Sequence, residues 1–209
     1  MADTSIAAQA LSSYNLKDLT IGVLGGHSAL DVCEGAKKLG FKTLAVCQRG
    51  REKTYADYYK TRTATGAAAT NTEKSRGCID EILLVDKFTD IVKPEVQEEL
   101  RRRNTIFIHN RYFWVYCDFK SIENDFAVPI YGTRELVRLE ERDQPGNQYE
   151  LLRKAGIRLP KIIKKEELAA HFEAHGGPVI VKVNEATRTY ERAFFVATSQ
   201  ADYQEKCWF

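Results

Sequence analysis

The sequence predicts an α/β fold in which an N-terminal parallel-sheet domain is followed by a second, smaller domain. The first observation lies in residues 20–47, where an apolar run, a glycine turn, an amphipathic stretch and a second apolar run follow one another. A helix between two strands forms a βαβ crossover, which makes the strands parallel. The second observation is the turn-rich sequence DQPGNQ at residues 143–148, after which helical and hairpin patterns replace the strand–helix alternation.

The N-terminal domain, residues 1–142, is predicted to carry the sheet. A short amphipathic helix in residues 1–19 leads into it. The helix between the first two strands is predicted to be capped by Ser28 and Asp31 and to end at Gly40. The predicted strands span residues 20–24, 42–47, 80–86, 105–110 and 127–132, with a loop of small polar residues at 62–77 and helices at 93–103 and 133–142.

The second domain, residues 143–209, is predicted to combine short helices with one hairpin. The hairpin pairs PVIVKV with RAFFVA, and short apolar runs rich in Val, Ile and Phe are typical of buried strands. The sequence stops on Trp208 and Phe209, whereas a chain terminus is usually polar, so we expect a chain that is cut short. The predicted elements are a helix ending at Gly156, a helix at 164–177, strands at 178–183 and 192–197, and a helix capped by Ser199.

The bulk composition is that of a soluble globular protein. The chain has 209 residues, of which 44% are hydrophobic and 29% charged, and its formal net charge is +2. This charge is too small to indicate a nucleic-acid or acidic-membrane partner. No apolar run approaches the roughly 18 residues that span a bilayer, and the N-terminus does not resemble a secretory signal.

The cysteines indicate a reducing compartment. Their count is odd, none forms a CxxC pair, and the four histidines do not complete a zinc spacing. We therefore expect free thiols, a cytoplasmic location and no metal held by these residues. The five are Cys33, Cys47, Cys78, Cys117 and Cys207.

A lysine near the end of the first hairpin strand is a candidate phosphate ligand. Lys182 follows Ile180 and Val181, and the loop NEATRTYE comes next. A lysine on a rigid strand beside such a loop would supply a fixed positive charge for a polyphosphate. The alternative is an exposed strand lysine with its charge in water, and these residues alone leave both open.

The loop between the first strand and the first helix is a second candidate site. Glycines let the backbone approach a phosphate, and the free N–H groups at a helix start favour an anion. His27 could donate a hydrogen bond to a phosphate or a sugar hydroxyl, or it could be a plain exposed turn residue. The spacing does not match the dinucleotide fingerprint G-x-G-x-x-G. The loop residues are Gly25, Gly26, His27 and Ser28.

Three polar residues follow the fourth predicted strand. In an open parallel sheet the carboxyl ends of the strands line the ligand crevice, so His109, Asn110 and Arg111 should face the same crevice as the glycine loop. Arg111 could bind a phosphate through a two-pronged contact. Its alternative is a surface salt bridge.

Four stretches together resemble a known family. These are LGGHSALDVCEGAKKLGF, VPIYGTRELVRLEER, LLRKAGIRLPK and VIVKV, and they occur in one order along nearly the whole chain. The chain resembles the archaeal formate-dependent FAICAR synthetases of the ATP-grasp superfamily. The resemblance implies an N-terminal pre-ATP-grasp domain, residues 1–142, followed by the first part of an ATP-grasp domain, residues 143–209.

The resemblance also implies an activity. The family uses ATP to activate formate as formyl phosphate, and the amine of 5-aminoimidazole-4-carboxamide ribonucleotide (AICAR) takes the formyl group to give FAICAR in purine (IMP) biosynthesis. The implied partners are AICAR, formate and ATP with Mg²⁺, and a homo-oligomer is left open. His27 aligns with a histidine that contacts the nucleotide, and Lys182 with a lysine that touches ATP phosphate.

The chain departs from the family pattern in three places. Many members have HGS where this chain has His109-Asn110-Arg111, and many have a glycine-rich loop after the lysine strand. Here Arg188 and Arg192 would replace backbone contacts to ATP, beside Lys182 and Val183. The acids that hold Mg²⁺ would lie beyond Phe209, so no metal ligand and no catalytic residue is assigned, and the fragment is expected to be inactive.

Two other functions remain open from the sequence. One is an ATP-grasp paralogue that ligates another carboxylate to an amine, which the Arg111 and loop departures favour. The other is a non-catalytic module that binds a ribonucleotide at Gly25 to Ser28 without using ATP.

Overall fold

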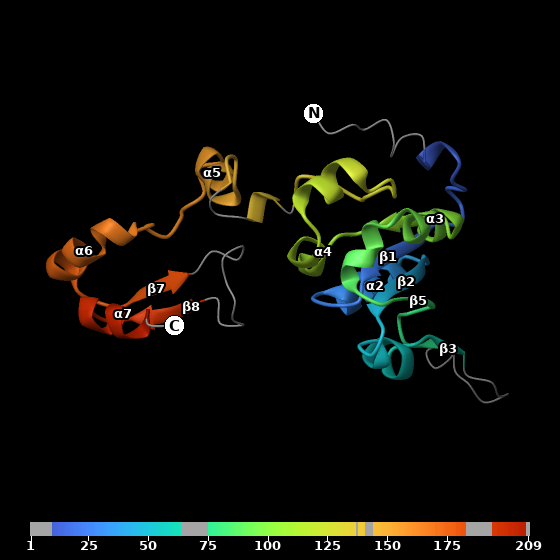
Figure 1. Ribbon diagram of the computed structural model, residues 1–209, viewed down its shortest axis with the longest axis horizontal. Coiled ribbons are helices and arrows are strands. Elements are labelled where there is room, and N and C mark those ends of the chain that lie inside the picture. Colours follow the sequence, from blue (N-terminus) through green and yellow to red (C-terminus); the bar gives the residue numbers. More distant parts are fainter. Residues whose placement is uncertain (1–9, 64–74, 137, 141–143, 183–193, 208–209) are drawn as a thin grey trace. The chain divides into compact units, whose positions relative to one another are not determined.

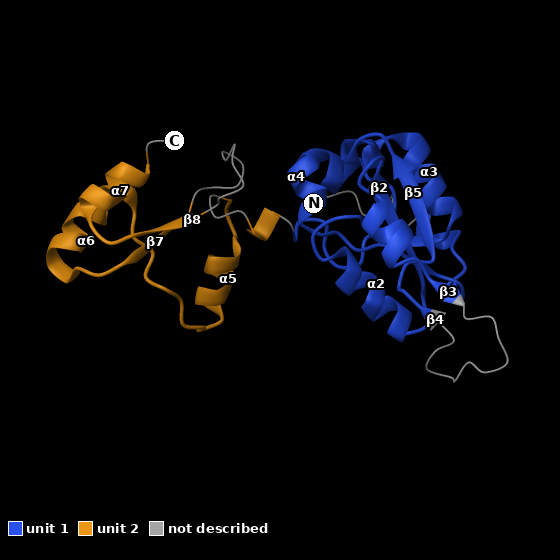
Figure 2. Cartoon of the chain, turned by 90° about the horizontal axis from the view of Figure 1, so that it is seen from below, with its two compact units in different colours: residues 1–137 blue, residues 138–209 orange. Residues whose placement is uncertain are grey.

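The chain folds into two compact units, residues 1–137 and 138–209 (Figure 2). The structure is a computed structural model that describes residues 10–63, 75–136, 138–140, 144–182 and 194–207. This division does not test the predicted domain boundary near residue 143, which stays a prediction.

A parallel four-stranded sheet forms the centre of the first unit (Figure 1). Its order is β5-β2-β1-β6, and β1 pairs in parallel with β2 on one side and β6 on the other. The first crossover is the predicted βαβ unit, with α2 (Ala29–Lys38) between β1 and β2. The strands are β1 (Thr20–Leu24), β2 (Lys42–Gln48), β5 (Glu81–Val85) and β6 (Thr105–Phe107).

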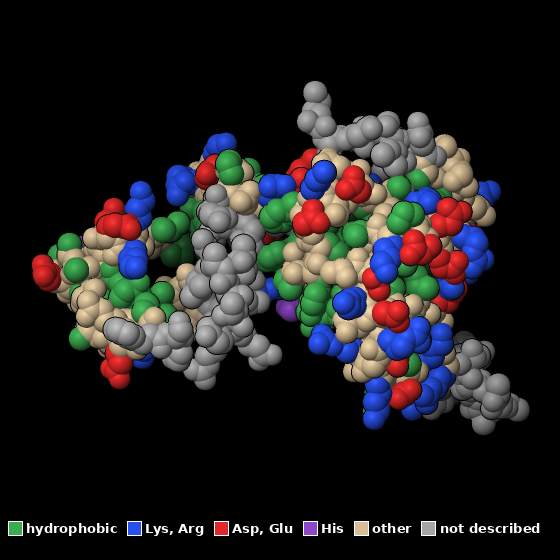
Figure 3. Space-filling view, viewed as in Figure 1, with side chains coloured by type: hydrophobic (Ala, Val, Ile, Leu, Met, Phe, Trp, Pro, Cys, Tyr) green, Lys and Arg blue, Asp and Glu red, His purple; other side chains and the backbone are tan. Residues whose placement is uncertain are grey.

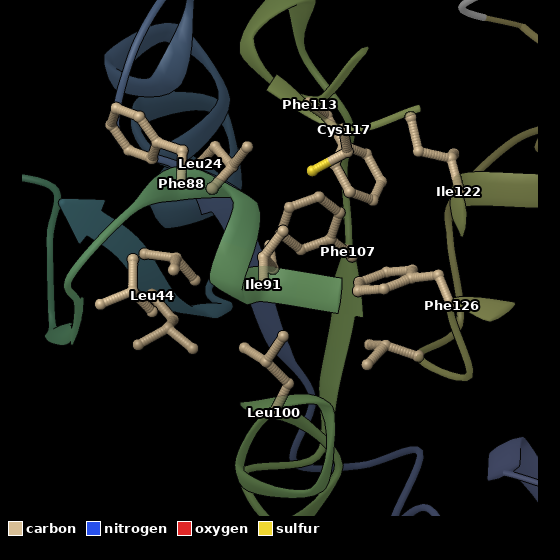
Figure 4. Close-up of a cluster of buried hydrophobic side chains, with 13 residues drawn as sticks. Leu24, Leu44, Phe88, Ile91, Leu100, Phe107, Phe113, Cys117, Ile122 and Phe126 are labelled. Carbon is tan, nitrogen blue, oxygen red and sulfur yellow. The ribbon is translucent and has the colours of Figure 1, made fainter. Parts of the chain in front are cut away.

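Alternating side chains of the strands supply a core on each face of the sheet. Val23 packs with α2 and with Tyr55 of η1 (Thr54–Tyr58), whereas Leu24 packs on the opposite face. Successive strand side chains point to opposite faces, so one strand serves both cores. The second core, drawn in Figure 4, includes the rings of Phe107 and Phe113 and receives side chains from η2 (Phe88–Val92), α3 (Pro94–Arg102), α4 (Arg111–Tyr116) and η3 (Ser121–Asp125).

The predicted loop at residues 62–77 is closed by a short hairpin. β3 (Arg62–Thr63) pairs antiparallel with β4 (Ser75–Arg76). Residues 64–74 lie outside the described residues. In the predicted lead-in helix, residues 10–12 are helical and residues 1–9 are not described.

Two predictions between residues 127 and 142 were wrong. The predicted fifth strand is a single parallel bridge between Ile130 and Phe107, and the predicted helix is a turn followed by a short 3₁₀ helix, η4 (Arg138–Glu140). The reason lies in Arg134, whose guanidinium donates hydrogen bonds to main-chain carbonyls. These carbonyls belong to Ile122 (3.1 Å), Phe126 (2.6 Å) and Val128 (3.2 Å). These bonds reach back 6 to 12 residues along the chain, and tertiary contacts of this kind override a local helical pattern.

The second unit holds three short α-helices and one hairpin among its described residues. Asn147 caps α5 by accepting hydrogen bonds from the N–H groups of Tyr149 and Glu150, and Ser199 caps α7 as predicted. Gly156 and Gly176 take positive φ beyond the ends of α5 and α6. The elements are α5 (Gln148–Lys154), η5 (Lys165–Glu167), α6 (Leu168–His175), β7 (Val179–Lys182), β8 (Phe194–Ala197) and α7 (Gln200–Lys206).

The hairpin strands are not buried as predicted. β7 and β8 pair antiparallel, and α7 packs against β8, where Tyr203 lies beside the ring of Phe195. The opposite face leaves Ile180 65% exposed and Phe194 63% exposed. A two-stranded sheet covered on one side buries only half of its side chains, whatever their hydrophobicity.

Charges of both signs alternate over the surface that Figure 3 shows, which fits the small net charge. Among the described residues, no helix is long and apolar enough to cross a membrane.

Asp80 ties β2 to the start of β5. Its carboxylate accepts hydrogen bonds from Lys37 (2.9 Å) and from the Thr43 N–H (2.9 Å). Burial raises the pKa of the Asp80 carboxyl, but these hydrogen bonds lower it by more. The pKa in the folded chain therefore lies below its ordinary value. The carboxylate therefore stabilises the fold above its ordinary pKa, and this contribution is lost as the pH falls through the lowered value.

We expect Asp80→Ala to destabilise the chain by about 2 kcal/mol, because it removes charge-assisted hydrogen bonds at a site only one-fifth exposed. Asp18→Ala is the matched control, since its ion pair with Lys42 is more than half exposed on both sides and should contribute far less to stability. Urea unfolding at pH 7 measures both. Equal losses in the two variants would contradict the role of Asp80.

Candidate functional site

The glycine loop lies where the sequence predicted it, at the carboxyl end of β1. Its backbone is fixed by the sheet, since the Gly25 N–H donates to the Val46 carbonyl at 2.7 Å. A Cβ on Gly25 would lie 2.7 Å from the Cys47 sulfur, and a Cβ on Gly26 would lie 2.0 Å from the Tyr112 ring. Neighbouring side chains therefore leave no room for anything but glycine at either position.

The next two residues are presented to solvent. His27 and Ser28 are both exposed, and the Ser28 hydroxyl lies 2.8 Å from Nδ1 of His27. Ser28 adopts a left-handed backbone with φ of 63° and makes no side-chain cap, so the predicted capping pair with Asp31 was wrong. The hydroxyl is engaged with the histidine ring instead, and the two side chains form one polar unit.

Asn110 joins the glycine loop to the segment that follows β6. This side chain is buried, with 8% of its surface exposed. Its Nδ2 donates to the Leu24 carbonyl at 2.8 Å, and its Oδ1 accepts from the Tyr112 N–H at 3.1 Å. The structure thus brings the two predicted clusters together at one edge of the sheet, as the parallel pairing of β1 and β6 requires.

His109 is held as a neutral ring. Burial lowers its pKa, and a hydrogen bond to the backbone of Thr133 opposes this only in part. Its Nε2 is buried without a hydrogen-bond partner among the described residues. A lowered pKa favours the neutral ring near pH 7. His109 is therefore suited to form a hydrogen bond through Nε2, not to supply charge.

Arg111 is the first residue of α4. Its guanidinium carbon lies 6.0 Å from the centre of the Trp114 ring, a cation–π contact within one turn of helix. In sequence, the arginine directly follows Asn110.

Two tyrosines that shape the loop were not expected from the sequence. The Tyr55 hydroxyl donates to the Gly26 carbonyl at 3.3 Å, and the Tyr112 ring lies against the same glycine. Arg51, which follows β2 and donates to the Tyr116 hydroxyl at 3.4 Å, was not expected either. Tyr55 lies in η1 and Tyr112 in α4, and only the fold brings them against the loop.

Lys182 lies on the open face of the hairpin in the second unit. The register pairs it with Phe194, and Ile180 and Val196 share this face, on which Lys182 is also exposed. An exposed lysine among apolar side chains suits a ligand with a flat apolar part and a charged part. The other residues expected at ATP, Val183, Arg188 and Arg192, lie outside the described residues.

The described residues offer no fit for a metal ion. None of their His, Cys, Asp and Glu side chains gather in groups of three or more that could hold one. The cysteines are free thiols, and Cys33 and Cys47 lie in the core with pKa values raised to about 12 by burial.

Residues 21–163 match the family described as "Protein of unknown function (DUF1246)", and the chain belongs to that family. The chain is also similar to curated proteins named 5-formaminoimidazole-4-carboxamide-1-(beta)-D-ribofuranosyl 5'-monophosphate synthetase. It is 38% identical over 198 residues to the one of Methanothermobacter thermautotrophicus and 34% identical over 196 residues to that of Methanopyrus kandleri. These alignments cover 94% of this chain but only 46% and 47% of the relatives, so the chain spans about half of their length.

Solved structures share the fold. The IMP biosynthesis protein PurP from Thermococcus kodakaraensis superimposes with a TM-score of 0.52 at 18% identity, covering 84% of this chain and 48% of that one. An ADP complex of purK, N5-carboxyaminoimidazole ribonucleotide synthetase, gives 0.55 at 12% identity over 90% and 43%. The likeness confirms the predicted α/β class with a parallel sheet, and the shared name of the curated relatives confirms the family resemblance.

The lowered pKa of His109 makes a pH prediction. In the unfolded chain the His109 ring binds a proton near its ordinary pKa of 6.5, whereas in the folded chain it does so only at a lower pH. Protonation therefore favours the unfolded chain, and this group destabilises the fold as the pH falls from 7 to 5. We expect His109→Asn, which retains a donor for the Thr133 backbone, to reduce the loss of stability measured by urea unfolding across that range. His27→Asn, a change at an exposed ring, is the control, and an equal pH dependence in wild type and His109→Asn would contradict the prediction.

Proposed function

We propose that this chain is the N-terminal part of an ATP- and formate-dependent ligase that formylates AICAR to FAICAR in IMP biosynthesis. The name that the curated relatives share supports this reaction. The observation that carries the proposal is the His27–Ser28 pair, exposed at the carboxyl edge of the sheet on a loop that Asn110 joins to the start of α4. A preorganised polar loop at this edge suits the phosphate or ribose of a nucleotide.

The first unit would bind the ribonucleotide. His27 and Ser28 would donate hydrogen bonds to its phosphate or sugar, with Gly25 and Gly26 setting the path of the loop. Arg111 would supply the positive charge, because the neutral ring of His109 cannot. Nε2 of His109, which has no hydrogen-bond partner among the described residues, would form a hydrogen bond with the substrate.

The second unit would contribute to ATP binding. Lys182 would contact phosphate while the apolar side chains around it face the base, and Val183, Arg188 and Arg192 would complete this part of the site. A formate oxygen attacks the γ-phosphorus and displaces ADP to give formyl phosphate. The substrate amine then attacks the formyl carbon, loses a proton and expels phosphate. Preorganised cations stabilise the charge that develops on the transferred phosphoryl group.

Mg²⁺ would accompany ATP in such a ligase, with its ligands expected beyond Phe209, and no step is assigned to a metal. A cytoplasmic location is part of the proposal and is supported by the free thiols. The common name of the relatives favours formylation over the two alternative functions.

We expect His27→Ala to weaken AICAR binding by about tenfold or more, because a hydrogen bond to a charged or polar ligand group contributes roughly 1.5–3 kcal/mol. Isothermal titration calorimetry of the 209-residue chain measures the affinity. His175→Ala, a change in the second unit, is the control. An unchanged affinity for a well-folded His27→Ala would remove this residue from the site, and a wild type that does not bind would contradict a substrate pocket in this chain.

We expect Lys182→Ala to weaken ATP binding by about tenfold or more without changing the melting temperature, since the side chain is exposed on an open face. Lys165→Ala removes an exposed lysine from the same unit and should leave ATP affinity unchanged. Titration with ATP compares the three proteins. Equal affinities in all of them would refute the assignment of Lys182.

A further inference from the structure

The glycine loop is held in place by side chains from three other parts of the first unit. Asn110, which follows β6 and caps α4, donates to the Leu24 carbonyl at 2.8 Å. Tyr55 of η1 donates to the Gly26 carbonyl at 3.3 Å, and the ring of Tyr112 in α4 occupies the space beside the Gly26 Cα. None of these contacts involves the exposed side chains that follow in the loop.

Asn110 makes two of these restraints at once. While its Nδ2 holds the Leu24 carbonyl, its Oδ1 accepts the Tyr112 N–H and so caps the start of α4. The same side chain therefore fixes the end of β1 and the helix turn that carries the Tyr112 ring over Gly26. Leu24 is fully buried and Asn110 is 8% exposed, so water replaces neither bond easily.

We propose that Asn110 is a positioning residue that presents His27 and Ser28 to an anionic or hydroxyl-bearing part of the substrate. This inference rests on the proposed function and changes the role expected from the sequence, in which Asn110 contacts the substrate itself. Both hydrogen-bonding ends of the amide are already used inside the protein. A loop that is ordered before binding loses less conformational freedom when the ligand arrives, and its affinity rises accordingly.

The second unit contains a control of the same kind. Like Asn110, Asn147 donates from Nδ2 to a main-chain carbonyl, that of Gln144 at 3.0 Å, and its Oδ1 accepts the Tyr149 N–H at 3.0 Å to cap α5. It also accepts the Glu150 N–H, and it is 8% exposed. A substitution at Asn147 therefore changes a helix-capping amide within the second unit.

The test compares Asn110→Asp with Asn147→Asp. Aspartate retains the oxygen that caps the helix and removes the donor to the carbonyl. Asn110→Ser is a second, uncharged variant that can still cap but is too short to hold Leu24, and Asn147→Ser is its counterpart. Two measurements are made on the 209-residue chain: hydrogen–deuterium exchange of the peptide covering residues 24–29, and calorimetric affinity for AICAR.

We expect both Asn110 variants to raise the exchange rate of residues 24–29 by about tenfold and to weaken AICAR binding by about tenfold, with neither Asn147 variant doing so. Unchanged exchange of the loop in a folded Asn110 variant would overturn the inference. So would AICAR affinity equal to wild type with faster exchange. A wild type that does not bind AICAR would count against the proposed function, while the exchange measurement would still decide whether Asn110 positions the loop.

Discussion

The central position of β1 is the constraint on which the first unit depends. Its five residues are buried; all five pair in parallel with β2, and Thr20 to Gly22 also pair in parallel with β6. There is little space at this junction, since a Cβ on Gly22 would lie 2.4 Å from a methyl carbon of Thr105. Because parallel strands end at one edge, the segments after β1 and β6 must meet there. The candidate site is a consequence of this pairing, and Asn110 completes it with a single buried amide.

Within the site, one set of residues holds the loop in place and another presents polar groups to solvent. Gly25 and Gly26 are required by the side chains packed against them, and Asn110 uses both of its polar ends on the protein backbone. His27 and Ser28 are exposed and paired with each other. Such a division gives fixed donors on a stiff support, which is what binding a nucleotide without a large ordering cost requires.

The second unit presents a different balance. Its hairpin is covered by α7 on one face and open on the other, where Lys182 shares the surface with Ile180, Phe194 and Val196. Burying an apolar side chain stabilises a protein by roughly 1.5–3 kcal/mol, and the three exposed apolar side chains do not gain this stabilisation within the unit. The chain spans about half the length of its curated relatives, and the proposed ATP site uses this open face.

The sequence by itself determined the elements whose signals are local. The apolar run and glycine turn before α2 predicted the βαβ unit, and the order of strand ends predicted that His109 to Arg111 lie near the glycine loop. Tertiary structure decided what depends on distant partners. Arg134 binds three carbonyls where a helix was expected, the Asn110 amide reaches the Leu24 carbonyl, and burial lowers the pKa of His109. A local pattern records which conformations a segment prefers, whereas these outcomes follow from contacts between residues that only the fold brings together.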